Sequence, residues 1–298
     1  MATCRDIATF GVVALDDVLP PEVAGDLADH LRECRACSAY LAQSASTSGI
    51  VAMRHSASEE VGRVTDADAA DTADQRGTAR TQRLLLALAR AADPLHADDL
   101  VQDTWQHLLE VSPDTVPTRT ELSDHLLDHL RRHRHDDEAL EAEWADVLLR
   151  TYRHHPTAMG EADSRLISSR MTDNSRGPEA HEWLDPDADH ADLFHPEFYD
   201  DGPDADTWIN PPTAWPTITR ILSPDAELET ADLYRAVDSA LEELPPSVGD
   251  AVYLVDLQGH SIETASFLLG ANREDARAAL SIGRNHLRGR IDNYLSSH

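Results

Sequence analysis

Apolar residues recur at helical spacing in three stretches of the chain. The clearest run falls at i, i+3, i+4, i+7, i+8 and i+11, and consists of Leu233, Ala236, Val237, Ala240, Leu241 and Leu244. This spacing places them on one side of a helix that Pro245 would end. A second run lies within residues 78–155, and a shorter one lies within residues 1–44. Because no stretch has the pattern of a series of strands, we predict an all-α protein.

The stretches between these helices lack a steady period. Residues 45–77 are rich in Ser, Asp, Ala and Gly, and residues 156–225 are rich in Pro, Asp and His. Such compositions are typical of solvated linkers. We therefore predict three small helical domains that are joined by disordered linkers over 45–77 and 156–225. The predicted domains cover residues 1–44, 78–155 and 226–298.

Composition and charge narrow the possible partners. The chain of 298 residues has a net charge of −30, and all 25 of its basic residues are arginine. So acidic a chain is a poor non-specific binder of nucleic acid, and any DNA contact must come from a local basic stripe. No apolar run is long enough to span a bilayer and no leader is evident, which predicts a cytoplasmic protein without a membrane partner. An odd number of cysteines, all before residue 38, argues against a secreted disulfide framework.

Four residues near the amino terminus have the spacing of a metal site, Cys4-x25-His30-x3-Cys34-x2-Cys37. His30 and Cys34 are i and i+4 on a helix expected over 17–34, so they share a face, and Cys37 lies just past its end. Zinc takes four nitrogen or sulfur ligands in a tetrahedron, and Cys4 completes the set. Four protein ligands leave no open position for water, so we predict a structural zinc ion and no enzyme activity. The alternative is a set of buried cysteines and a helix histidine without metal.

This spacing and the flanking sequence LPPEVAGDLADHLRECRACSAYL resemble the zinc-binding anti-sigma domains of bacteria, specifically their redox-sensing members. The resemblance implies a domain that wraps a sigma factor and hides its polymerase-binding surfaces. Some members of that family lose zinc and form a disulfide when oxidised, and then release the sigma factor.

The C-terminal stretch predicts a pair of helices joined by a tight turn. Ser261 is placed to cap a short helix that ends at Gly270, and Asn272 is placed to cap a long one. Two helices joined in this way are typical of a helix-turn-helix.

A stripe of arginines follows the long helix. At about 100° per residue, four of them fall within a stripe roughly 60° wide. They are Arg273, Arg277, Arg284 and Arg288. Beside an apolar face, such a stripe offers guanidinium groups to the phosphates and base edges of DNA. The alternative is a solvated surface stripe, which the neighbouring acids Glu274 and Asp275 favour.

The stretch ALEELPPSVGDAVYLVDLQGHSIETASFLLGANREDARAALSIGRNHLRGRI resembles region 4 of the extracytoplasmic-function sigma factors. The resemblance implies binding to the promoter −35 element and to the flap of RNA polymerase. A Thr-Val pair usually opens the recognition helix in that family, whereas Asp275 and Ala276 stand near that place here.

The middle stretch RLLLALARAADPLHADDLVQDTWQHLLEV resembles region 2 of the same sigma factors. The family's Asp-x-x-Gln-acid-Thr-aromatic pattern appears here as Asp99, Gln102, Asp103, Thr104 and Trp105. In that family this helix docks on the polymerase clamp. The resemblance therefore implies a docking face formed by Asp98, Asp99, Gln102 and Asp103. The alternative is the charged outer face of a helical bundle.

The stretch ELSDHLLDHLRRHRHDD stands where that family has its promoter-melting helix. Its candidates for phosphate contacts are Arg131, Arg132 and Arg134. The family holds flipped bases with aromatic residues, and none lies between Val111 and Glu143.

Together these features predict a sigma-factor-like transcription regulator that binds core RNA polymerase and promoter DNA. The amino-terminal zinc domain would gate it in cis, through metal loss or thiol oxidation. The alternative is a non-initiating protein that binds polymerase, or a partner sigma or anti-sigma factor, without opening DNA. The missing aromatics and the acidic balance favour that alternative.

Overall fold

The computed structural model describes residues 2–15, 19–62, 70–113, 115–133, 144–149, 193–222 and 227–297. Within these ranges the regular structure is helical, and the only β-type pairing is an isolated antiparallel bridge between Phe198 and Trp208. The predicted all-α class is therefore confirmed for this part of the chain. No helix within it is both long and apolar enough to cross a membrane.

The amino-terminal unit consists of α1 (Cys4–Asp6), η1 (Ile7–Gly11), η2 (Val12–Leu15) and α2 (Pro21–Glu33). A capping box between the side chains and backbone of Thr3 and Asp6 starts α1. α2 begins at a proline, whose missing N–H needs no partner in the first turn of a helix. The apolar stripe of α2 is buried and consists of Val23, Leu27 and Leu31.

The central helix is α3 (Arg35–Gly62), and α4 (Ala70–Ala92) follows it. The predicted linker over 45–77 is therefore wrong for residues 45–62 and for the residues from 70 onward. Every residue from Cys37 to Ala52 except Ala42 is buried, so this helix lies inside the protein.

The composition of α3 explains why its sequence pattern predicts a linker. Its Ser, Thr, Ala and Gly side chains let other helices approach from all sides, so it has no single apolar stripe. Gly49 is one such point, because an added Cβ would lie only 2.7 Å from Cδ1 of Ile218. The hydroxyls of Ser44 and Thr47 donate to carbonyl groups one turn earlier in the same helix.

The middle block contains α4, α5 (Ala97–Val111) and α6 (Arg119–His133), which pack against one another. Leu85, Leu88, Leu122 and Leu126 fill its core. A helical turn over residues 144–149 lies near α2, where Asp146 pairs with Arg32 at 3.6 Å.

The C-terminal block contains α9 (Ile218–Ile221), α10 (Glu227–Glu242), α11 (Pro246–Val252), η7 (Tyr253–Leu257), α12 (Ile262–Leu269) and α13 (Arg273–Ser297). The predicted caps are confirmed, since Ser261 Oγ accepts from the N–H of Thr264 and Asn272 Oδ1 accepts from that of Asp275. Gly270 ends α12 with φ at 66°, in the left-handed region that favours glycine.

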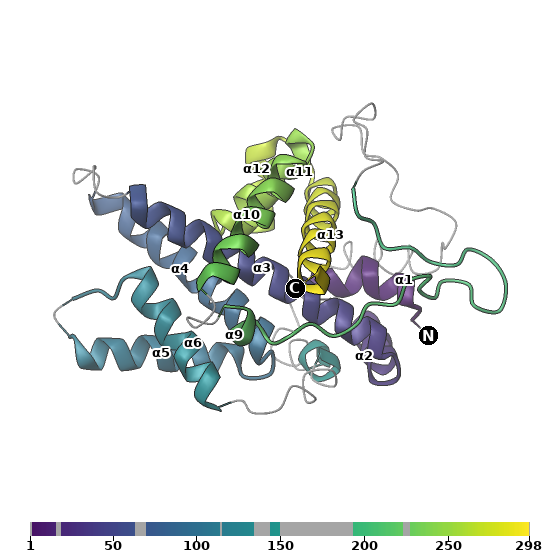
Figure 1. Ribbon diagram of the computed structural model, residues 1–298, viewed down its shortest axis with the longest axis horizontal. Helices are drawn as coiled ribbons and strands as arrows, with labels where there is room; N and C mark the ends of the chain where they lie inside the picture. The colour runs from purple at the N-terminus through teal and green to yellow at the C-terminus, as the bar shows by residue number, and fades with distance from the viewer. Residues whose placement is uncertain are drawn as a thin grey trace.

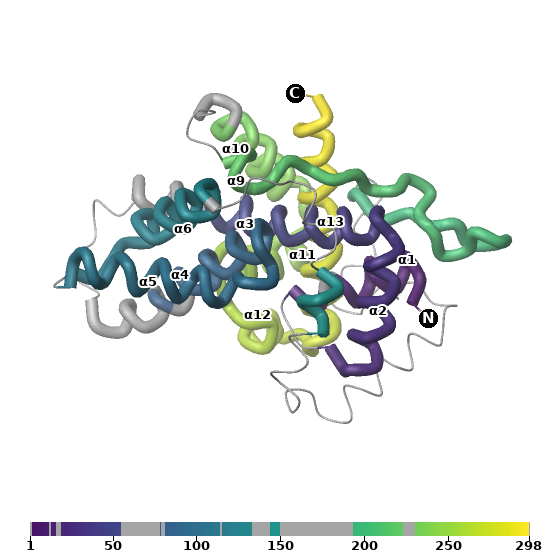
Figure 2. The backbone as a smooth tube through the Cα atoms, turned by 90° about the horizontal axis from the view of Figure 1, so that it is seen from below, coloured from purple at the N-terminus to yellow at the C-terminus, as the bar shows by residue number. Residues whose placement is uncertain are grey.

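Residues 193–222 form an extended segment that we call the strap. In Figures 1 and 2 it runs from the side of α1, past α13, to α9. The predicted disordered linker over 156–225 is wrong for the strap, because Leu193, Trp208 and Ile218 are buried in the common core. The part of that prediction over 156–192 lies outside the described residues.

All three blocks share one hydrophobic core. α3 runs from the amino-terminal unit to the middle block, and the C-terminal helices stack against it (Figures 1 and 2). α3 packs on α4 on one side and on α13 and η7 on another. The helix that begins beside the predicted metal site therefore connects the three parts of the protein.

Candidate metal centre

The four predicted ligands meet at one point between three helices. Cys4 opens α1, and His30 lies in the last turn of α2. Cys34 is the C-cap residue directly after α2, and Cys37 lies in the first turn of α3. Their ligand atoms all lie within 4.8 Å of one another. The structure therefore brings together all four residues predicted from the spacing, and we call them the Cys3His cluster.

The distances within the Cys3His cluster are compatible with zinc. Two sulfurs bound to zinc at about 2.3 Å in a tetrahedron lie about 3.8 Å apart. Cys4 Sγ and Cys34 Sγ are separated by 3.9 Å. His30 Nε2 lies 3.6 Å from Cys4 Sγ and 3.2 Å from Cys37 Sγ, close to the edge expected between nitrogen and sulfur ligands.

Hydrogen bonds within the Cys3His cluster shift the pKa values of Cys34 and His30 in opposite directions. The pKa of the Cys34 thiol is far below its usual range, first because of its hydrogen bond with Cys37 and then because of those with Cys4 and His30. The pKa of His30 is raised to about 10, first by Cys34 and then by Cys4. Zinc binds thiolate and neutral imidazole, so metal binding here displaces protons.

The strap contacts the Cys3His cluster through Trp208. Nε1–H of Trp208 donates to Cys37 Sγ over 3.1 Å, and both side chains are buried. The indole packs on Tyr40 and Phe198, with ring centroids 5.0 and 4.6 Å away. A hydrogen bond donated to a metal-binding sulfur fixes the orientation of that sulfur and tunes its charge. Sequence reasoning missed Trp208, because it placed this residue in a solvated linker.

Ion pairs fasten the strap to α1. Nε of Arg5 binds Asp206 at 2.6 Å, and an Nη atom binds Asp200 at 2.8 Å. The Arg5 guanidinium also lies over the ring of Phe198, 5.2 Å from its centroid. The strap is thus bound to the same short helix that carries Cys4.

Side chains of α3 connect the Cys3His cluster to α13. Three residues after Cys37, the Tyr40 hydroxyl donates to Asn285 Oδ1 over 2.6 Å. One turn further on, Gln43 Oε1 accepts from Arg288 over 2.8 Å, and the Arg288 guanidinium stacks on the Tyr40 ring. The Gln43 amide donates to the strap at the carbonyl of Thr213.

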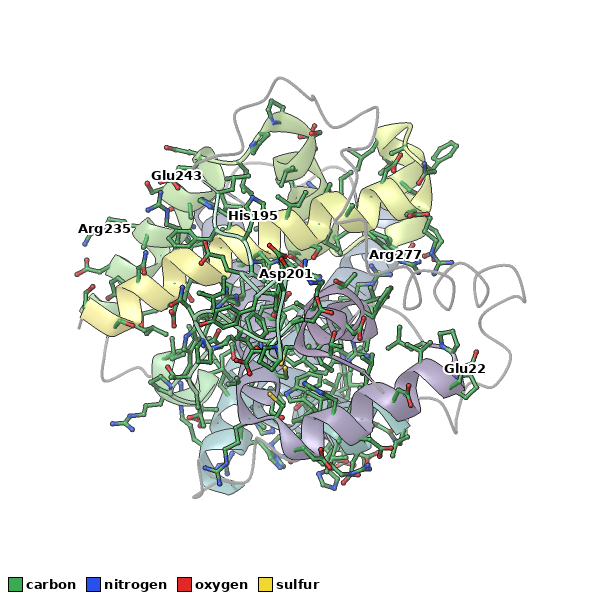
Figure 3. The ribbon with its side chains drawn as sticks, turned by 90° about the vertical axis from the view of Figure 1, so that its right-hand side faces the viewer. Glu22, His195, Asp201, Arg235, Glu243 and Arg277 are labelled. Atoms are coloured by element: carbon green, nitrogen blue, oxygen red, sulfur yellow. The ribbon has the colours of Figure 1, made fainter. Side chains whose placement is uncertain are left out.

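The arginines predicted to contact DNA have different surroundings along α13. The Arg288 side chain of α13 packs against α3 and is largely buried. This burial lowers the pKa of its guanidinium. Arg284 forms a buried ion pair with Asp256 at 2.6 Å. In this structure its side chain is therefore not exposed for contact with DNA. Arg273 pairs with Glu263 at 2.7 Å. Figure 3 shows Arg277 near the amino-terminal end of α13.

The two acids predicted to oppose DNA binding, Glu274 and Asp275, differ in their burial. Asp275 is buried, and its carboxylate accepts from the side-chain amide of Asn272 over 2.6 Å. The Asp275 carboxylate therefore holds the side chain of the capping residue Asn272 at the start of α13. Glu274, the other acid, is partly buried.

Two of the three arginines predicted in the middle block lie on α6, and both bind backbone carbonyl groups. Arg131 donates to the carbonyl of Leu222, at the end of the strap, over 2.7 Å. Arg132 donates to the carbonyl of Asp128, and Arg134 lies outside the described residues. Arg131 and Arg132 thus contact the end of the strap and their own helix, and not the arginines of α13.

The predicted polymerase-docking residues lie on the outer face of α5. Asp98, Asp99, Gln102 and Asp103 are exposed. On the inner face Thr104 is buried, and Trp105 donates through Nε1 to Gln82 Oε1 over 2.8 Å. Their exposure fits a docking face, and whether they bind polymerase stays a prediction.

A buried histidine joins α13 to the strap. His286 Nδ1 accepts from the backbone N–H of Phe194 over 3.3 Å, so we assign the proton to Nε2, which donates to Glu243 Oε2 over 2.8 Å. Burial lowers the pKa of His286, although its bond with Glu243 opposes the shift. Arg290, which also binds Glu243, adds to the lowering. Figure 3 shows His195 and Glu243 on the same side of α13.

Comparison of the chain with protein-family models, with curated proteins and with solved structures gave no match.

Proposed function

We propose that this protein is a sigma-factor-like transcription regulator that a zinc ion in the Cys3His cluster holds in a closed arrangement. The observation that carries the proposal is the course of α3. This helix carries the predicted metal ligand Cys37 in its first turn, packs on α4 of the region-2-like block and binds α13 of the region-4-like block. The two blocks that would act on polymerase and DNA are thus fastened to the helix that starts at the metal centre.

The contacts of two arginines support a closed state. Arg288 is a predicted DNA contact, yet its guanidinium binds Gln43 and stacks on Tyr40. Arg131 is another, and it binds the carbonyl that ends the strap. Both side chains must leave these internal contacts before they reach phosphates. Because the inhibiting helix is part of the same chain, its local concentration is high, and modest contacts suffice to hold the closed state.

The Cys3His cluster supplies the release mechanism. Its ligands come from α1, α2 and α3, so zinc binding and the folding of this small unit are coupled. Peroxide that oxidises two thiols to a disulfide, and is itself reduced to water, removes two ligands together. Cys4 and Cys34, with sulfurs 3.9 Å apart, are such a pair. Loss of the metal then frees the start of α3. Tyr40 would no longer be held in place to bind Asn285 of α13.

The test is co-elution of the full chain with bacterial core RNA polymerase, zinc-loaded and reduced against peroxide-treated. We expect co-elution after oxidation, loss of it in an Asp103→Arg variant, and retention in Glu110→Arg. Both residues are exposed acids of α5, but only Asp103 belongs to the predicted docking face. Co-elution in both states would make the metal purely structural. No co-elution in either state would refute the sigma-like proposal.

The second candidate is a non-initiating protein that occupies polymerase or a partner sigma factor. The absence of aromatic residues between Val111 and Glu143, a range that includes α6, favours it. Transcription from a pre-melted promoter separates the two candidates. An initiation factor with weak melting regains activity on that template, whereas a non-initiating binder stays inactive.

A further inference from the structure

The start of the strap is attached to α13 through a buried histidine. His286 of α13 is fully buried, and its Nδ1 accepts a hydrogen bond from the backbone N–H of Phe194 over 3.3 Å. The Phe194 ring lies against the imidazole, with ring centroids 5.9 Å apart. The same ring covers Gly289 of α13 so closely that a Cβ at this glycine would meet it. Phe194 thus joins the strap to α13 through both its backbone and its ring.

The backbone contact requires a neutral imidazole. A backbone N–H can only donate, so Nδ1 of His286 carries a lone pair, and Nε2 carries the proton that is donated to Glu243 Oε2 over 2.8 Å. A protonated imidazole is a donor at both nitrogens. A second proton on His286 would therefore set two N–H donors against each other, and Nδ1 could no longer accept from Phe194.

The groups that act on the charge of His286 come from three parts of the protein. Burial is the largest influence and lowers the pKa of His286. Glu243, in the turn after α10, opposes this shift, whereas Arg290 of α13 and His195 of the strap add to it. Glu243 also binds Arg290 at 2.6 Å, so part of its negative charge is already balanced. The attached strap therefore favours the neutral imidazole.

We propose that protonation of His286 releases the start of the strap from α13. When Nδ1 gains a proton, Phe194 leaves it, and the face of α13 around Gly289 is uncovered. The strap has other attachments without histidine, namely Arg5 with Asp206, Trp208 with Cys37, Gln43 with Thr213 and Trp215 with Asp292. Release is therefore confined to the start of the strap. It follows from the contacts of His286 and does not rest on the proposed function.

The direction and size of the effect follow from the linkage between protonation and release. Because the pKa of His286 is lowered while Phe194 is bound, the bound arrangement is most stable above the pKa of an exposed histidine, about 6.5, and weakens as the pH falls below it. Each pH unit below this value favours release by up to about tenfold, as long as the bound form stays neutral. Between about pH 7.5 and pH 5.5 the released population should rise roughly three- to tenfold.

The test is hydrogen exchange of the zinc-loaded full chain at about pH 7.5 and pH 5.5, corrected for the intrinsic pH dependence of amide exchange. We expect protection of residues 193–198 to fall roughly three- to tenfold at the lower pH, while residues 213–222 keep theirs. His286→Gln keeps an acceptor for Phe194 and a donor for Glu243 but gains no proton, so its protection should not change. The matched control is His195→Gln, at the exposed histidine next to Phe194, and it should respond like the wild type.

A second variant keeps the test decisive if His286→Gln folds poorly. Glu243→Gln removes the carboxylate that opposes the lowered pKa of His286, so loss of protection should begin at a lower pH than in the wild type. The proteins are compared at equal zinc content, measured at each pH, which separates release of the strap from loss of the metal.

Three results would overturn the inference. The first is that wild type and His286→Gln show the same change in protection of residues 193–198, or that neither shows any. The second is that His195→Gln abolishes the pH dependence, because His195 would then be the group responsible. The third is that Glu243→Gln moves the loss of protection to higher pH. None of these measurements involves DNA or polymerase, so this inference and the proposed function fail independently.

Discussion

Replacement of Trp208 by Phe should weaken zinc binding by the Cys3His cluster. The indole N–H donates to Cys37 Sγ over 3.1 Å, and phenylalanine keeps the aromatic contact but removes this donor. The ring would still pack on Tyr40 and Phe198. The change thus isolates one hydrogen bond to a metal ligand.

The expected loss follows from the charge on the sulfur. A hydrogen bond to a charged group contributes about 1.5–3 kcal/mol, and each 1.4 kcal/mol corresponds to about a tenfold change in affinity. Loss of a group that hydrogen-bonds to a metal ligand usually lowers the metal affinity about 10- to 100-fold. Both estimates place the loss for Trp208→Phe at about one to two orders of magnitude.

The assay is competition for zinc with a chromophoric chelator under reducing conditions. Trp215→Phe is the matched control, because it removes another indole N–H of the strap that donates to Asp292, on α13, over 2.6 Å. Its zinc affinity should equal that of the wild type. If Trp208→Phe binds zinc as tightly as Trp215→Phe, the strap is no part of the metal centre and the reasoning is refuted.

Three other changes test the packing around α13. Arg284→Met leaves the buried Asp256 without its partner and should lower the free energy of unfolding by about 3–5 kcal/mol in urea titrations, and a loss under about 1 kcal/mol would contradict the buried pair. The pKa of His286 is lowered in the folded state, so the stability that its neutral form provides is complete above the unfolded pKa of about 6.5 and falls as the pH drops below it. His286→Gln should therefore show a smaller loss of stability than the wild type between about pH 7 and pH 5 in the same titrations, and equal slopes would argue against a buried neutral imidazole. Gly289→Ala places a Cβ against the Phe194 ring and should speed limited proteolysis within the strap, whereas Gly25→Ala, which meets nothing, should not.

The Cys3His cluster was predictable from the sequence because the chemistry of a metal site restricts the spacing of its ligands. His30 and Cys34 are one helical turn apart, and thiol and imidazole groups at such spacing have few other common roles. The caps of the C-terminal helices were predictable for a similar reason, since Ser261 and Asn272 each satisfy backbone N–H groups locally.

The central helix was not predictable from the same patterns. A helix that is buried on all sides shows no alternation of polar and apolar faces, and small residues such as Gly49 and Ser48 are also typical of linkers. What distinguishes them is tertiary packing, for example the close approach of Ile218 to Gly49.

The strap was missed because its acidic composition dominates its pattern. Aromatic residues within it were the available signal, since Phe198, Trp208 and Trp215 are unusual in a solvated linker. Composition gives no register for an extended segment, so the contact between Trp208 and Cys37 appears only in the folded structure.

Hydrogen exchange of the full chain tests most directly whether the metal centre holds α13 closed. The measurement compares zinc-loaded, reduced protein with protein treated with a chelator. We predict that amides of residues 285–291 on α13 and of residues 37–47 on α3 lose protection when zinc is removed, while those of α5 and α6 keep theirs. Unchanged protection of α13 after complete zinc removal would contradict the account.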